Sequence, residues 1–66
     1  MDRFLKHEEV IEVTGLSPVS IWRLEGRGEF PKRRKISPNR VGWLASEVDE
    51  WIHTRPIASE EEADRG

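Results

Sequence analysis

The apolar residues near the start of the chain have the spacing of a short helix over residues 7–14. Val10, Ile11 and Thr14 fall on one face at the helical period. Gly15 follows directly, where a helix end favours a residue that can adopt positive φ. The pattern therefore predicts a first helix that ends at Thr14.

A second helix is predicted after a turn of only two residues. Ser17 is a good N-cap residue, and Pro18 suits the first helical position because the N–H that proline lacks has no partner there. Ile21 and Leu24 mark its apolar face, and two glycines bracket its end. Two capped helices joined by a glycine turn are typical of a helix-turn-helix.

Two short runs, 33–36 and 41–44, predict a β-hairpin after the second helix. They flank the sequence Ser-Pro-Asn, which supplies turn residues. An isolated hairpin is marginally stable in water, so it must pack on the helices. We expect Ile36, Val41 and Trp43 to make these contacts.

The run SEVDEWIHT predicts a third helix, with Ser46 as its N-cap and an apolar stripe of Val48, Trp51 and Ile52. Together the elements predict a mainly α fold of three short helices with a small β-hairpin. We expect this domain to span residues 1–55. Residues 56–66 carry a block of acids without periodicity, which predicts a disordered acidic tail.

The charges are sorted along the chain, although the formal net charge is only −2. Residues 17–43 contain seven basic and two acidic residues, whereas residues 44–54 contain three acids and no base apart from a histidine. Such sorting predicts one basic face with an acidic back. An acidic net charge therefore does not argue against binding to nucleic acid.

Composition narrows the class of protein further. The chain contains no cysteine, which excludes disulfides and thiolate metal sites. No apolar run approaches the ~20 residues of a membrane span, and no signal-peptide pattern opens the chain. We expect a soluble cytoplasmic protein without a membrane partner.

The order of motifs resembles the AlpA family of small phage and prophage regulators, relatives of phage excisionases and of the DNA-binding heads of MerR-type regulators. The turn V…TGLS is followed by SIWRL, by GEFP, by a basic strand, by VGW and by SEVDEWI. The resemblance covers Phe4 to about Thr54. It departs from the family pattern at Pro18, where a basic or polar residue is frequent, and at the turn SPN, where glycine is frequent.

This resemblance implies a winged helix-turn-helix that binds double-stranded DNA, with no cofactor and no enzymatic activity. Some members of the family regulate promoters, and others act as excisionases, the recombination directionality factors that bend DNA for an integrase. Integrase and RNA polymerase are therefore candidate partners, as is a second copy bound cooperatively on DNA. Such a protein is expected at the nucleoid, in the host cytoplasm if a phage encodes it.

The predicted DNA-binding residues form two groups. The second helix is expected to enter the major groove, with Arg23 as a candidate for a bidentate contact to guanine. The wing is expected to hold the phosphate backbone or reach a minor groove. The helix group is Ser17, Pro18, Val19, Ser20, Trp22, Arg23 and Arg27, and the wing group is Lys32, Arg33, Arg34, Lys35, Asn39 and Arg40.

Other interpretations of these residues remain open at this level. Trp22 could pack on the wing, Arg23 could be a solvated side chain, and Ser20 could either meet a phosphate or bond to the backbone. Arg34 shares a strand face with Ile36, so it could lie partly against the protein.

A different class of function is the main alternative. His7 and His53 have no second ligand at metal-binding spacing, so no metal site is predicted. No acid–base pair or nucleophile suggests an enzyme. The alternative is a protein-interaction module, such as an antitoxin or a phage inhibitor, which would use the acidic third helix and tail.

Overall fold

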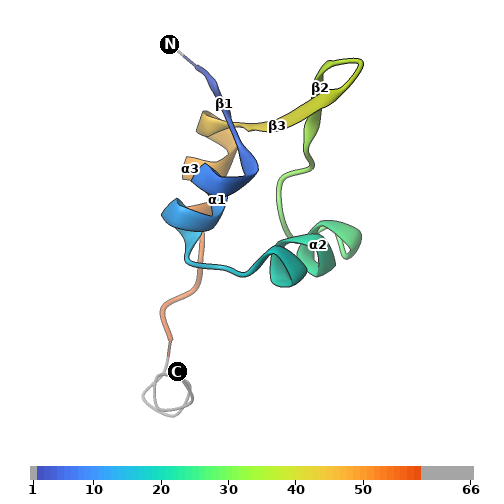
Figure 1. Cartoon of the computed structure of the whole chain (residues 1–66). Coiled ribbons are helices and arrows are strands. Elements are labelled where there is room, and N and C mark those ends of the chain that lie inside the picture. The colour runs from blue at the N-terminus through green and yellow to red at the C-terminus, as the bar shows by residue number, and fades with distance from the viewer. Residues whose placement is uncertain (1, 59–66) are drawn as a thin grey trace.

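The computed structural model describes residues 2–58, which form three helices and three short strands (Figure 1). The order is β1 (Phe4–Leu5), α1 (His7–Thr14), α2 (Pro18–Gly26), β2 (Arg34–Ser37), β3 (Arg40–Leu44) and α3 (Ala45–His53). The predicted fold class is confirmed, with one strand more than expected. Among the described residues, no helix is long and apolar enough to cross a membrane. Most of the predicted acidic tail, residues 59–66, lies outside the described part.

The first two helices begin and end where the sequence predicts. Gly15 adopts a φ of 73°, and its N–H donates to the carbonyl of Ile11 at 2.8 Å, which closes α1. At the start of α1, the Glu9 carboxylate accepts from the N–H of Lys6 at 2.9 Å. At the start of α2, the Ser17 hydroxyl accepts from the N–H of Ser20 at 3.2 Å. Local capping thus fixes both helices of the helix-turn-helix.

The N-terminus of α3 is capped from a distant part of the chain, so the prediction of Ser46 as N-cap is wrong. The helix begins one residue earlier, at Ala45, and Leu44 is the N-cap residue without a side-chain bond. The Asp2 carboxylate instead accepts from both the N–H and the hydroxyl of Ser46, at 3.0 and 2.7 Å. The N–H of Ala45 donates to the carbonyl of Arg3 at 2.7 Å. The N-terminal segment therefore satisfies the free donors of this helix.

The sheet has the antiparallel order β1-β3-β2, which makes β3 the central strand. Strand β1, which the sequence analysis did not predict, pairs Phe4 with Leu44 and Leu5 with Trp43. Strands β2 and β3 form the wing, a hairpin that projects beyond the helices (Figure 1). Within the sheet, the hairpin is thus joined to β1 through β3.

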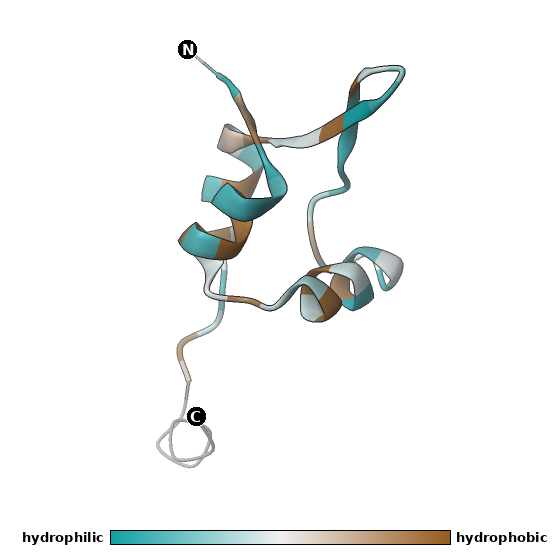
Figure 2. Cartoon of the chain, in the orientation of Figure 1, coloured by the Kyte–Doolittle hydropathy of each residue, from teal (hydrophilic) through white to brown (hydrophobic). Residues whose placement is uncertain are grey.

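The core collects one or two apolar side chains from nearly every element. Hydrophobic residues occur in short stretches on all three helices and on β3 (Figure 2). Trp51, predicted to be a core residue, is only half buried and packs edge-on against Phe30 with ring centroids 4.7 Å apart. Strand β2 contributes no buried side chain. The buried residues are Leu5, Val10, Ile21, Phe30, Trp43 and Val48.

Two of the three side chains expected to anchor the wing do not enter the core. Trp43 is buried as predicted, but Ile36 is 45% exposed and Val41 is 48% exposed. The register is irregular between Lys35 and Ser37, at the position of Ile36. Ile36 therefore lies across Gly42 of the neighbouring strand and does not reach the helices.

Candidate nucleic-acid interface

Helix α2 presents a large apolar and basic surface to solvent. Ile21 is buried, which turns Val19, Trp22 and Arg23 outward. Trp22 is 66% exposed, whereas Trp43 is 2% exposed. A large exposed aromatic side chain on a small domain has a cost in water that a binding partner would remove. The exposed position of Trp22 therefore marks this face of α2 as a candidate contact surface.

The start of α2 is held by a pair of serine hydroxyls. The Ser17 hydroxyl donates to the Ser20 hydroxyl at 3.0 Å, in addition to capping the helix. Ser20 is half buried, while Ser17 and Pro18 are exposed. The Ser20 hydroxyl thus bonds to a side chain, and the exposed end of the helix is formed by Ser17, Pro18 and Val19.

A basic groove lies between the C-terminal half of α2 and the segment that leads to the wing. It has a volume of about 550 Å³. Its carboxylate, Glu25, is paired with Arg33. The remaining cations are available to an anionic ligand, and Trp22 supplies an aromatic wall. The charged and aromatic lining comprises Trp22, Arg23, Glu25, Arg27, Lys32 and Arg33.

Arg33 is held tightly against α2. Its guanidinium donates to one oxygen of Glu25 and its backbone N–H donates to the other, both at 2.9 Å. The Glu25 side chain is only 9% exposed. The guanidinium also lies 5.8 Å from the ring centroid of Trp43. Arg33 therefore joins the wing to α2.

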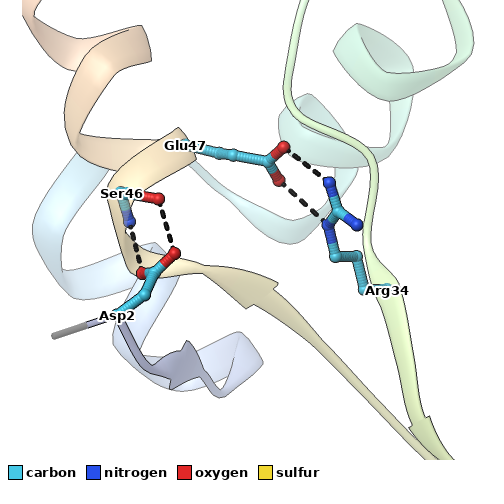
Figure 3. Close-up of polar contacts among 4 residues, drawn as sticks. All are labelled: Asp2, Arg34, Ser46 and Glu47. Atoms are coloured by element: carbon cyan, nitrogen blue, oxygen red, sulfur yellow. Dashed lines mark hydrogen bonds and ion pairs between the residues drawn. The ribbon is translucent and has the colours of Figure 1, made fainter.

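Arg34 makes the corresponding contact with α3 (Figure 3). Its guanidinium donates twice to the Glu47 carboxylate, at 2.8 and 3.3 Å. These hydrogen bonds lower the pKa of Glu47 and raise the pKa of Arg34. Arg34, which the sequence left undecided between the protein and DNA, thus contacts α3. Neither the charge run nor the hairpin pattern showed that both arginines have carboxylate partners.

The other wing residues predicted to bind DNA are exposed. Lys32, Lys35, Asn39 and Arg40 point into solvent, and no ion pair joins them to another residue within 2–58. Lys35 lies opposite Val41 in the hairpin. The six wing residues predicted to bind DNA therefore divide into two that are paired and four that are open to a ligand.

A smaller hollow of about 270 Å³ separates α2 from the wing. His7, Trp22, Arg33 and Val41 are among its lining residues. His7 stacks on Trp43 with ring centroids 5.7 Å apart. His53 is on the far helix, where its Nδ1 lies 3.5 Å from the Asp49 carboxylate. The described residues contain no cluster of side chains that could hold a metal ion.

Comparisons with known proteins show which family the chain is similar to. Residues 3–56 match the model of the family described as Prophage CP4-57 regulatory protein (AlpA). The chain is 41% identical over 54 residues to the uncharacterized protein ORF88 of Enterobacteria phage P4, covering 82% of this chain and 61% of that protein. It is 33% identical over 61 residues to the DNA-binding transcriptional activator AlpA of Escherichia coli K12, covering 80% of this chain and 84% of that protein.

Proposed function

The chain belongs to the AlpA family of prophage regulatory proteins, and from this premise we propose that it binds DNA through α2 and the wing and regulates transcription. The family is one of regulators and not of enzymes. The relative from Escherichia coli is a DNA-binding transcriptional activator. Its match extends over most of both chains.

The basic groove beside α2 is the observation that supports the proposal most directly. It brings Arg23 of α2 and Arg27, the C-cap residue of α2, to one groove with Lys32 of the segment before the wing, and the exposed Trp22 lines the same groove. Cations beside an exposed aromatic ring suit a phosphate backbone and the sugars and base edges next to it. No acidic side chain without a basic partner lines this groove.

In the proposed complex, the exposed N-terminal end of α2 enters the major groove. Ser17, Pro18 and Val19 come nearest to the bases, and Arg23 contacts a guanine or a phosphate. The tip of the wing, with Asn39 and Arg40, follows the backbone into the neighbouring minor groove. The protein acts by occupying and shaping DNA in the cytoplasm, and RNA polymerase or a second copy on an adjacent site responds to that occupancy.

A selection experiment tests the proposal. The full chain is used to enrich binding sequences from a library of random duplexes, and the enriched duplex is then titrated at several salt concentrations. We expect one enriched sequence. A plot of log affinity against log salt concentration should have a slope of about −0.9 for each neutralised phosphate. A chain that retards neither the library nor any enriched duplex would instead be a protein-interaction module, such as an antitoxin or phage inhibitor.

The proposal extends to action as an excision factor, because an excisionase would use the same two surfaces to bind DNA. Two measurements distinguish the two roles. The first is bending of the selected duplex, measured by its gel mobility with the site at its centre or its end. The second is an excision assay with an integrase. Promoter activation without stimulation of excision supports the transcriptional role.

A further inference from the structure

The outer strand of the wing, β2, and its inner strand, β3, make different contacts with the rest of the domain. Strand β3 is paired on both sides and carries the buried Trp43. Strand β2 is an edge strand that pairs only with β3, and none of its side chains is buried. Hydrophobic packing therefore does little to fix β2 relative to the helices.

Two consecutive arginines supply what packing does not. Arg33 reaches α2 through Glu25. Arg34 reaches α3 through Glu47 (Figure 3). Arg33 directly precedes β2 and Arg34 is its first residue, so the two ion pairs connect this end of the wing to two different helices. Each pair uses two hydrogen bonds, which fixes orientation as well as distance.

We infer that Glu25 and Glu47 are positioning residues for DNA binding, and that Arg33 and Arg34 are their partners and not the main phosphate ligands. The two ion pairs hold the wing at a fixed angle to α2, so that the tip of the wing and the reading face of α2 fit neighbouring grooves of one duplex. This inference rests on the proposed function. The phosphate grip then comes from Lys32, Lys35 and Arg40.

Neutralising the two acids separates this role from simple electrostatics. Glu25→Gln and Glu47→Gln each remove a negative charge near DNA, which by electrostatics alone would strengthen binding to any duplex. If the acids position the wing, the same variants bind the selected duplex about 3- to 10-fold more weakly, while binding to random duplex stays constant or strengthens. The quantity to measure is the ratio of the two affinities at one salt concentration.

Two further variants complete the design. Glu12→Gln makes the same charge change on an exposed residue of α1 that has no ion pair among the described residues, so its affinity ratio should equal that of the parent. Arg34→Lys keeps the charge but loses the planar fork, so a positioning role predicts that the ratio falls as in Glu47→Gln. A phosphate ligand would tolerate lysine.

Hydrogen exchange tests the same inference without DNA. In Glu25→Gln and Glu47→Gln, the amides of β2 should exchange faster while those of α1 and α3 remain protected. Faster exchange at β2 together with a lower affinity ratio supports the inference. An affinity ratio that matches Glu12→Gln, or exchange at β2 that matches the parent, overturns it. Failure of the parent to bind any duplex overturns the proposed function instead, and the exchange result still decides whether the acids hold the wing.

Discussion

The base and the tip of the wing are built from one basic run but have different physical tasks. We define the base as Arg33, Arg34, Gly42 and Trp43, and the tip as residues 35–41. At the base, both arginines are paired with carboxylates and Trp43 is buried. At the tip, all side chains except that of the half-buried Ser37 are exposed, and the two cations make no ion pair within residues 2–58.

This difference shows that adjacent cations in a sequence can differ in what they contribute. The formal charge of the run counts every arginine and lysine equally. In the folded chain, Arg33 and Arg34 stabilise the placement of the hairpin, and only the remaining cations present an unbalanced positive charge to solvent. Stability should therefore respond to substitutions at the base, and the salt dependence of DNA affinity should respond to substitutions at the tip.

The largest effect on stability in this set is expected from Gly42→Ala at the base. A Cβ on Gly42 would lie 2.8 Å from Cδ1 of Ile36 and 3.0 Å from the backbone oxygen of Leu5. Ile36 is exposed and can move, but the Leu5 oxygen belongs to the pairing of β1 with β3. Such overpacking typically costs about 1–3 kcal/mol, a large fraction of the stability of a 66-residue domain.

Urea unfolding of Gly42→Ala and the parent measures this cost. Gly26→Ala is the matched control, because a Cβ there meets nothing within 4 Å and the residue is helical. We expect the control to be neutral or more stable by about 0.5–1 kcal/mol. Equal stability of Gly42→Ala and Gly26→Ala would mean that β1 does not press on Gly42.

The second expected effect is a change in the salt dependence of DNA binding when cations of the tip are removed. Lys35→Ala/Arg40→Ala removes two exposed cations that have no ion pair in the described chain. We expect the slope of log affinity against log salt to become shallower by about 0.9 for each residue. The free energy of unfolding should stay within about 0.5 kcal/mol of the parent, because both side chains are on the surface.

This double variant has a direct counterpart at the base. Arg34→Lys keeps its charge, so its slope should equal that of the parent even though its affinity for the selected duplex falls. An unchanged slope in the tip variant would overturn the assignment of the phosphate contacts to the tip.

Whether a contact of the base or the tip could be predicted from the sequence depends on how far apart its two residues lie along the chain. The bounds of α1 and the cap of α2 were predicted correctly, because Gly15, Ser17 and Pro18 act within one turn of chain. The partners of the arginines, Glu25 and Glu47, lie 8 and 13 residues away, and no local pattern joins them. The resemblance to the family predicted a wing, but it did not show which cations of the wing are paired.

The N-terminal segment was missed for the same reason. Two residues of β1 are too few to give a periodic signal, and Asp2 caps a helix 44 residues further along the chain. The expected burial of Ile36 and Val41 was wrong because the irregular register and the close approach of Gly42 keep both side chains outside the core. Alternation along a strand cannot show such an irregularity.

The third expected effect concerns Trp22, which lines the hollow between α2 and the wing together with Trp43. Trp22→Ala on exposed α2 should leave the free energy of unfolding within about 0.5 kcal/mol of the parent. Its affinity for the selected duplex should fall about tenfold, equivalent to about 1.4 kcal/mol, because the ring loses its contact with DNA. A large loss of stability with unchanged affinity would show that Trp22 packs on the wing.

The smallest effect is a dependence of the base on pH. Asp2 caps α3 through Ser46, and the next residue, Glu47, holds Arg34 (Figure 3). Hydrogen bonds from Ser46 lower the pKa of Asp2 below its ordinary value of 3.8, and those from Arg34 lower the pKa of Glu47 below 4.5. A lowered pKa means that each carboxylate stabilises the fold fully above its ordinary pKa and loses this effect as pH falls through the pKa of the folded state.

Asp2→Asn tests this dependence through thermal unfolding between neutral pH and about pH 3. At neutral pH the variant should melt at a lower temperature than the parent, because its amide is a weaker acceptor for the N–H and hydroxyl of Ser46. The gap should narrow as pH falls below 3.8, since the parent then loses the same charge. A gap that stays constant into the acid range would show that Asp2 acts through packing. Acid should therefore loosen the base of the wing, where Glu47 holds Arg34.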